Sequence, residues 1–315
     1  MKKYFFTSIL YSSSLLLSSE NPVRKTLHLH FDVNKTIIAL DTALGKDLEE
    51  TVNCILAEFT FEKWDGIRKQ SYYAFLTDKI AQENINLSRA DEIFKHKRTE
   101  RLKEFPQYLN TWHPQLHVQY QDDKKRMLET LGKEKMVIFP SFFKVITWLN
   151  AHHPNQFALY LRTFGKDLPE VIPLIENTAS LKFANQGKFT GTTLTVGSTT
   201  HSIPEFFKNP QLHHYALQDD YPHWKSHGFQ TSGGKPFPID RDQKDIISVF
   251  FDDNADDPDK PIICPLNGNQ KVENTNELLA QGNIVAVNPK EAILNEDYFI
   301  NKIQALLNHS IIDLH

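Results

Sequence analysis

Residues 26–36 read TLHLHFDVNKT. The first six residues alternate between polar and apolar side chains, and strict alternation of this kind predicts a β-strand over residues 26–31. Asp32 follows directly, with Asn34 and Thr36 two and four positions later. The expected strand therefore ends in a cluster of polar groups.

Two later apolar segments end in a similar way. Residues 157–161 stop just before Thr163, and residues 246–251 run directly into Asp252 and Asp253. Segments with helical periodicity separate the strands, and strands alternating with helices predict a parallel sheet covered on both faces. The expected fold class is α/β, with a three-layer, Rossmann-like parallel sheet core. The expected helices cover residues 46–59, 168–175 and 298–307 and a segment that begins at Ser141.

The composition changes between residues 61 and 135. Aromatic side chains are scattered among charged ones there, and residues 98–104, RTERLKE, form a charged helical run. We expect residues 61–135 to be an inserted, mostly helical cap, with the core formed by residues 24–60 and 136–315. Residues 182–233 are rich in Thr, Ser, His and Asn, and their pattern assigns no element.

The polar groups at the strand ends are expected to meet. Ligands of open α/β sheets bind at the carboxyl ends of the strands, so Asp32, Asp252, Asp253 and Thr163 should lie near one edge. Carboxylate oxygens suit Mg²⁺, which also binds substrate phosphate. An Asp at such a position can attack phosphorus and form an acyl phosphate. These side chains therefore indicate phosphoryl transfer.

A lysine is needed to offset the charge of the phosphate oxygens in such a reaction. The sequence SGGKPFP, residues 232–238, precedes the third strand, and its glycines permit close approach of the backbone. Lys235 is the expected phosphate ligand, and Lys225 is the alternative.

A further pair of acids, Asp219 and Asp220, follows the apolar residues 215–217. Asp is common in turns, so a turn is the simpler interpretation of this pair. The alternative is another strand end that contacts substrate.

These segments resemble the sequence motifs of the haloacid dehalogenase (HAD) superfamily. The first family motif is an apolar strand followed by Asp, a second polar residue and Thr, and it matches residues 31–36. The second motif matches Thr163, the third matches Lys235 in its Lys-Pro context, and the fourth matches Asp252 with Asp253. The spacing between the first two motifs leaves room for a cap. The resemblance lies in four short motifs rather than in continuous similarity.

The resemblance implies a Mg²⁺-dependent hydrolase, in the first instance a phosphatase that forms an aspartyl-phosphate intermediate on a small phosphorylated substrate. Asp32 would be the nucleophile, and the phosphoryl group would be bound by Thr163 and Lys235. The implied metal ligands are Asp32, the backbone carbonyl of Asn34, Asp252 and Asp253. The implied catalytic set is Asp32, Asn34, Thr163 and Lys235.

Asn34 departs from the family pattern, because phosphatases of this family usually carry a second Asp there as general acid and base. An amide does not exchange a proton at neutral pH, and general acid catalysis contributes about 10² to 10⁴-fold. Either the substrate has a good leaving group, as acyl and aryl phosphates do, or another group replaces the acid. The alternative function is a catalytically weak HAD-like protein that binds a phosphorylated ligand or a protein partner.

The simpler interpretations assign no chemistry to these residues. Asp32 would then be a turn residue, and Asp252 and Asp253 would belong to the acidic loop DDNADDPD, residues 252–259. An unrelated α/β domain would match the four motifs by chance, and it would place Asp32 far from Asp253.

Composition excludes several classes of protein. The chain has 315 residues, is 40% hydrophobic and 23% charged, and carries a formal charge of −4, so no net positive field attracts nucleic acid. Its 2 cysteines are too few for a disulfide scaffold. No feature of the sequence indicates an oligomeric state.

The amino terminus leaves localisation open. Residues 1–20 begin with Met-Lys-Lys and continue with apolar residues and serines, which is the layout of a signal peptide. Such a leader would imply export or a periplasmic location, whereas an N-terminal extension would be compatible with the cytoplasm. The apolar stretch is shorter than the roughly 20 residues of a membrane-spanning helix, so no stable membrane anchor is expected. Cys54 and Cys264 would be buried thiols or, after export, a disulfide.

Overall fold

The computed structural model describes residues 25–39, 47–89, 91–132, 138–179, 181–208, 212–239, 245–257, 260–267, 270–271 and 274–312. The leader expected at residues 1–20 lies outside these ranges, as does residue 46, where the first helix was expected to begin. The strands of the central sheet are β1 (Thr26–Asp32), β4 (Phe157–Thr163), β5 (Asn185–Thr190), β6 (Thr193–Val196), β7 (Thr199–Ser202), β8 (Tyr215–Gln218), β10 (Ile246–Asp252) and β13 (Ile284–Ala286).

The central sheet has eight strands in the order β13-β10-β1-β4-β8-β5-β6-β7. Every neighbouring pair from β13 to β5 is parallel. Strands β6 and β7 continue the sheet as antiparallel hairpins. The predicted α/β class with a mostly parallel sheet is confirmed, and β1 lies inside the sheet between β10 and β4.

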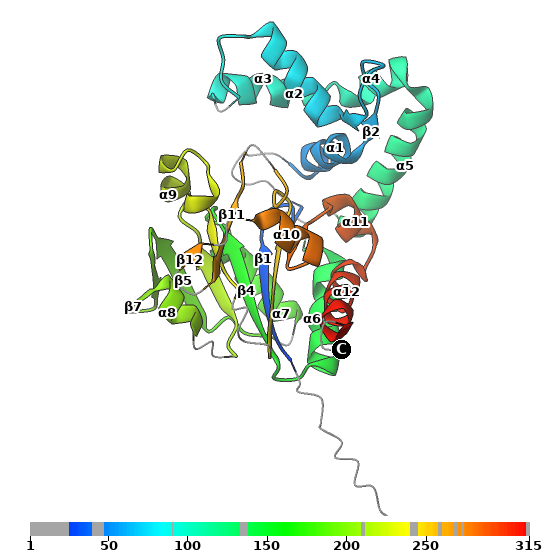
Figure 1. The fold of residues 1–315 in the computed structure, drawn as a ribbon. Helices are drawn as coiled ribbons and strands as arrows, with labels where there is room; N and C mark the ends of the chain where they lie inside the picture. The colour runs from blue at the N-terminus through cyan, green and yellow to red at the C-terminus, as the bar shows by residue number, and fades with distance from the viewer. Residues whose placement is uncertain are drawn as a thin grey trace, which may run out of the picture.

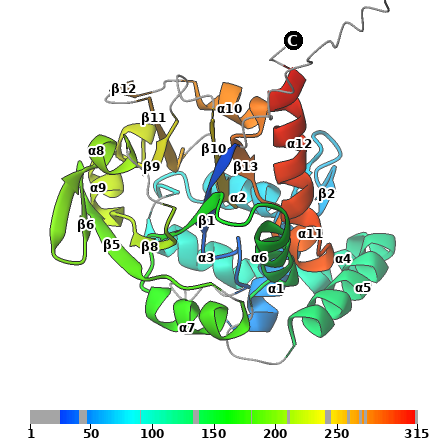
Figure 2. The same cartoon turned by 90° about the horizontal axis from the view of Figure 1, so that it is seen from below.

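Helices α6 (Pro140–His152), α7 (Leu168–Thr178) and α12 (Tyr298–Ile312) cover one face of the sheet (Figure 2). The side chains of β1 show why. Phe31 stacks on Phe251 and meets the rings of Phe142 in α6 and Phe299 in α12. Because successive side chains of a strand point to opposite faces, the Leu and Phe residues of β1 bury their apolar surface against these helices.

The other face of the sheet carries shorter elements. Helices α8 (Ile203–Lys208), α9 (Tyr221–Ser226) and α10 (Thr275–Gln281) lie there with a small sheet of β9 (Lys235–Pro238), β11 (Ile263–Asn267) and β12 (Gln270–Lys271) (Figure 2). His30 of β1 points to this side, where its ring stacks on Tyr160 and meets Phe207 of α8 and Phe237 of β9. The alternation in residues 26–31 therefore separates two buried faces rather than a buried face from a solvated one.

The described part of residues 182–233, which the sequence pattern left unassigned, contains β5 to β8 and the helices α8 and α9. The strand at the edge of the sheet is short and polar. Strand β7 reads TTHS, with three of its four residues exposed. Such a strand forms because hairpin pairing with β6 satisfies its backbone groups at the sheet edge, and it carries no apolar periodicity that the sequence could show.

A helical layer lies over the carboxyl ends of the parallel strands (Figure 1). It contains β2 (Phe61–Glu62), β3 (Gln70–Ser71), α2 (Tyr72–Glu83), α3 (Glu92–Leu102), α4 (Phe105–Trp112) and α5 (Pro114–Leu131). Helix α1 (Leu48–Phe59), which the sequence placed with the core, packs against α2, α3 and α5. It also contacts α11 (Pro289–Leu294), which lies beside α6 and α12.

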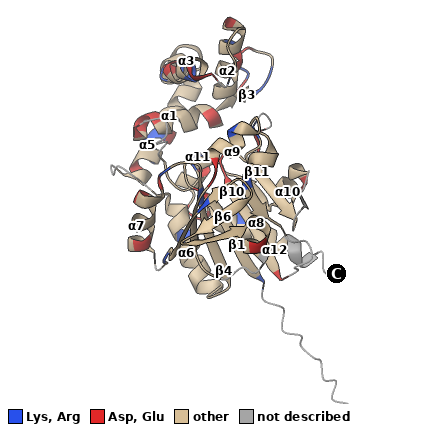
Figure 3. Ribbon diagram, turned by 90° about the vertical axis from the view of Figure 1, so that its left-hand side faces the viewer, with Lys and Arg blue, Asp and Glu red and all other residues tan. Residues whose placement is uncertain are grey.

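Acidic and basic residues are both distributed along the helices of this layer (Figure 3). Arg101 pairs with Glu83, and Lys124 pairs with Glu49. Exposed ion pairs of this kind contribute little to stability, so the apolar contacts among α1 to α5 hold the layer together.

The predicted thiols are both buried. Cys54 lies in α1 and Cys264 in β11, and they are not joined in a disulfide. Among the described residues, no helix combines the length and the apolar character that crossing a membrane requires.

Candidate active site

Three carboxylates meet where the central parallel strands end. Asp32 is the last residue of β1 and Asp252 the last of β10, and the register of the two strands sets these residues side by side. Asp253 follows directly, and its backbone N–H donates to Thr36 Oγ1 at 3.1 Å. Oxygen atoms of Asp32, Asp252 and Asp253 all lie within 4.8 Å of one another. The expected convergence of these acids is therefore present.

Lys235 supplies a cation to this group. Its ammonium lies 2.5 Å from Asp32 Oδ1 and 2.7 Å from Asp252 Oδ2, and the residue is only 1% exposed. Strand β9 begins at Lys235 and packs closely against the chain at Ile262. This is possible because Gly234 has no side chain, whereas a Cβ there would overlap the carbonyl of Ile262. Lys225, the alternative lysine, is exposed on α9. The structure thus brings Lys235 to the carboxylates.

Burial and charge act against one another at these groups. Burial raises the pKa of Asp32 to about 7, although the Lys235 ammonium acts to lower it. Burial also raises the pKa of Asp253 well above its usual value. For Lys235, burial alone would lower the pKa, but the carboxylates of Asp252 and Asp32 outweigh it and the pKa is raised. The lysine is therefore a permanent cation, whereas Asp32 changes its charge near neutral pH.

Asn34 points its amide toward another acid. Its Nδ2 donates to Asp167 Oδ2 at 2.9 Å, while its Oδ1 is buried without a partner in the structure. Asp167 lies in the loop after β4 and is 6% exposed. A Cβ at Gly165 would overlap the Asp167 carboxyl group, so a larger residue there would displace that carboxyl group from its present position. A carboxyl group that sequence reasoning missed therefore lies next to the one motif position where the expected acid is replaced.

Thr163 lies at the end of β4, next to β1, as expected. It is 1% exposed, and its hydroxyl accepts from the backbone N–H of Gly165 at 2.8 Å. Its backbone carbonyl accepts from Asp219 N–H at 2.6 Å. The hydroxyl and the following turn thus form a polar group at the strand end adjacent to Asp32.

Lys35 connects the loop after β1 to the helical layer. Its backbone adopts a left-handed conformation, with φ of 55°, and its ammonium contacts both carboxylate oxygens of Glu58 in α1, at 2.8 and 3.1 Å. Burial alone would lower the pKa of Lys35, but Glu58 and Asp253 outweigh it and raise that pKa. The loop that follows the candidate nucleophile is therefore tied to α1 by an ion pair.

A fully buried ion pair lies beside these residues. Arg162, inside the apolar strand β4, contacts both carboxylate oxygens of Asp219. Asp219 therefore belongs to a buried pair, whereas Asp220 caps α9 through the backbone N–H of His223. The signal available in the sequence was a single Arg between Leu161 and Thr163, in a strand that is otherwise apolar or aromatic.

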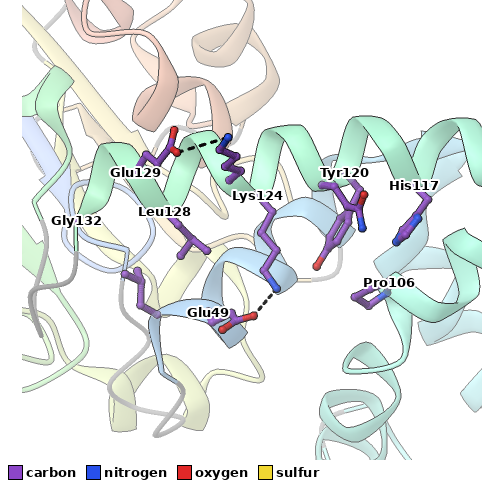
Figure 4. Close-up of a pocket in the computed structure, with 11 residues that line it drawn as sticks. Glu49, Pro106, His117, Tyr120, Lys124, Leu128, Glu129 and Gly132 are labelled. Carbon is purple, nitrogen blue, oxygen red and sulfur yellow. Dashed lines mark hydrogen bonds and ion pairs between the residues drawn. The ribbon is translucent and has the colours of Figure 1, made fainter.

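A separate cavity of about 890 Å³ lies in the helical layer between α1, α4 and α5 (Figure 4). Tyr120, Leu128 and Pro106 line it, and Lys124 reaches across it to Glu49. None of the candidate site residues lines this cavity. It is therefore distinct from the carboxylate group at the strand ends.

Comparison of the chain with protein-family models, with curated proteins and with solved structures gave no match. Arguments about function therefore rest on the geometry of this chain.

Proposed function

We propose that the protein is a Mg²⁺-dependent HAD-like hydrolase, a phosphatase that forms an aspartyl-phosphate on Asp32, with a Rossmann-like core. The observation that carries the proposal is the buried contact of Lys235 with both Asp32 and Asp252, next to Asp253. Two buried carboxylates and a half-buried third beside one ammonium are costly unless the excess negative charge is neutralised. A divalent cation meets that requirement, and such a cation also binds phosphate.

The carboxylate oxygens of Asp32, Asp252 and Asp253 are the hard donors that Mg²⁺ prefers, and they are close enough to share one ion. In the proposed site they would hold the ion together with the backbone carbonyl of Asn34. Bound there, Mg²⁺ would supply positive charge that stabilises the phosphate oxygens in the transition state.

Asp32 performs the covalent chemistry in the proposed reaction. An Asp32 Oδ atom bonds to phosphorus while the bond from phosphorus to the leaving-group oxygen breaks, and that oxygen keeps the electron pair. Water then attacks the same phosphorus, the Asp32–phosphate bond breaks, and inorganic phosphate leaves with Asp32 regenerated. The Lys235 ammonium and the Thr163 hydroxyl bind the phosphoryl oxygens through both steps.

The amide of Asn34 sets the expected substrate class. It cannot protonate a leaving group, so the substrates that react fastest are those whose leaving group departs without a proton, such as aryl and acyl phosphates. In the proposed reaction the leaving group would face the helical layer, which Lys35 and Glu58 join to the site through α1.

The direct test is hydrolysis of an aryl phosphate by the purified protein with added Mg²⁺. Asp32→Asn keeps the side-chain shape but removes the nucleophile, and we expect no turnover from it. Asp256→Asn, at an exposed acid of the same loop region, is the matched control and should retain the wild-type rate. Equal rates for wild type and Asp32→Asn would refute the nucleophile assignment.

The second candidate is a catalytically weak protein that binds a phosphorylated ligand or a partner through this site. The interaction of Asn34 with Asp167 favours it, because a fixed amide replaces the usual acid. It predicts Mg²⁺-dependent binding of a phosphate analogue such as beryllofluoride, without turnover of any phosphate in a substrate panel.

A further inference from the structure

The ion pair of Arg162 and Asp219 makes more contacts than neutralisation requires. Both side chains are 0% exposed. Arg162 Nε lies 3.2 Å from Asp219 Oδ2, and a second guanidinium nitrogen contacts the other carboxylate oxygen. The third nitrogen donates to the backbone carbonyl of Pro236 at 2.8 Å and lies 3.2 Å from His30 Nδ1. The guanidinium of Arg162 thus binds the carboxylate of Asp219 and, at the same time, the backbone of β9 in the small sheet.

The contact with Pro236 connects two sheets. Strand β9 pairs with β11 in the small sheet and does not belong to the central one. The Lys235 N–H donates to the carbonyl of Ile262 at 2.7 Å, inside the small sheet. The carbonyl of the following residue, Pro236, accepts from Arg162 of the central sheet. The backbone at Lys235 is therefore held by the small sheet through its own N–H and by the central sheet through the carbonyl of Pro236.

Stability alone does not account for this pair. Two charges taken out of water recover little net free energy from one another, and apolar residues of similar volume often replace such a pair without loss. Lysine would not reproduce the contacts, because only the guanidinium donates in several fixed directions at once. The geometry that requires arginine is the simultaneous contact with Asp219 and with β9.

We propose that Arg162, oriented by Asp219, is a positioning residue that fixes β9 against the central sheet and so sets the Lys235 ammonium between Asp32 and Asp252. The inference rests on the proposed function, in which that ammonium binds the phosphoryl group. Arg162 itself points to the opposite side of β4 from Thr163, since the two are successive residues of one strand. It therefore acts through Lys235 and not on the substrate.

The test replaces the pair by apolar residues, Arg162→Met with Asp219→Leu, so that no unpaired charge remains in the core. The matched control is Lys290→Met with Asp123→Leu, which removes a partly buried ion pair between α11 and α5. Four quantities are measured for each protein with Mg²⁺ present: the unfolding midpoint, kcat and KM for an aryl phosphate, and the rate at which acetic anhydride acetylates Lys235, read by mass spectrometry.

We expect the Arg162 and Asp219 double variant to fold, with kcat reduced at least about tenfold and a much smaller change in KM. Acetylation of Lys235, which is 1% exposed in the wild type, should become at least about fivefold faster. The control should change neither kcat nor the acetylation rate of Lys235. A folded double variant with wild-type kcat and a protected Lys235 would overturn the proposal.

Arg162→Lys covers the case in which the double variant does not fold. It keeps a cation against Asp219 but loses the donor to Pro236. We therefore expect the same loss of kcat and the same faster acetylation of Lys235. A wild-type kcat together with a wild-type acetylation rate would overturn the proposal. Failure of the proposed function has a different signature, since wild-type protein would then turn over no phosphate. The acetylation rates would still decide whether Arg162 positions Lys235.

Discussion

Replacing Lys235 by Met is expected to destabilise the metal-free protein strongly. The ammonium contacts Asp32 and Asp252 inside the core, and its removal leaves their two carboxylates facing each other without a counter-ion. Breaking a buried ion pair by removing one partner costs about 3–5 kcal/mol, because the remaining charge is uncompensated. At pH 8 the wild-type Asp32 is ionised, since its pKa is about 7 with Lys235 in place. The variant must then either bury two unpaired carboxylates or protonate Asp32, whose pKa rises without the ammonium, and either outcome costs stability.

The assay is urea unfolding at pH 8 in EDTA, followed by fluorescence and circular dichroism together. Adding Asp252→Asn to Lys235→Met removes one of the two charges and should recover at least about half of the loss. Mg²⁺ should also reduce the loss, because it binds the same carboxylates in the folded state only. Lys225→Met, at an exposed lysine, is the control and should stay within about 0.5 kcal/mol of wild type. A loss below about 1 kcal/mol for Lys235→Met, or no recovery with Asp252→Asn, would refute a buried charge balance at this site.

Three further outcomes are expected. Asn34→Asp sets a carboxyl group next to Asp167, and one of these two neighbouring carboxyl groups should retain a proton. The rate of alkyl phosphate hydrolysis should then rise at least about tenfold relative to the rate for an aryl phosphate. An unchanged ratio of the two rates would argue against a missing proton donor. The affinity for Mg²⁺ should weaken by about tenfold or more per pH unit well below pH 7 in calorimetric titrations. Burial raises the pKa of Asp32 to about 7 and also raises that of Asp253, and the ion binds only the carboxylate forms; an affinity that does not change between pH 5 and 8 would contradict this. Burial lowers the pKa of His28 from 6.5 to about 4, so the folded state favours the neutral ring and loses about 3 kcal/mol of stability as the pH falls through this range. His28→Leu should abolish that part of the pH dependence in unfolding curves, whereas Tyr160→Phe, which removes only the hydroxyl beside the ring, should keep it.

Local pattern in the sequence determined the core of the fold. Alternation in residues 26–31 and the apolar runs before Thr163 and Asp252 predict strands that the structure contains, each extended by one or two residues. Strand ends in a parallel sheet share one edge, so the meeting of Asp32 with Asp252 followed from the order of elements alone. These features need only neighbours along the chain and the general rules of α/β sheets.

Tertiary structure decided the rest, because the deciding contacts join distant residues. Lys235 is 203 positions from Asp32, and exposure rather than local sequence separates it from Lys225. The partner of Asn34 is Asp167, 133 positions away, in a loop that offers no periodic signal. Arg162 and Asp219 look like a strand residue and a turn residue in the sequence, and only the packing of β9 on the central sheet makes them a buried pair with a second contact. Such contacts depend on how sheets are placed in space, and hydrophobic periodicity carries no information about that placement.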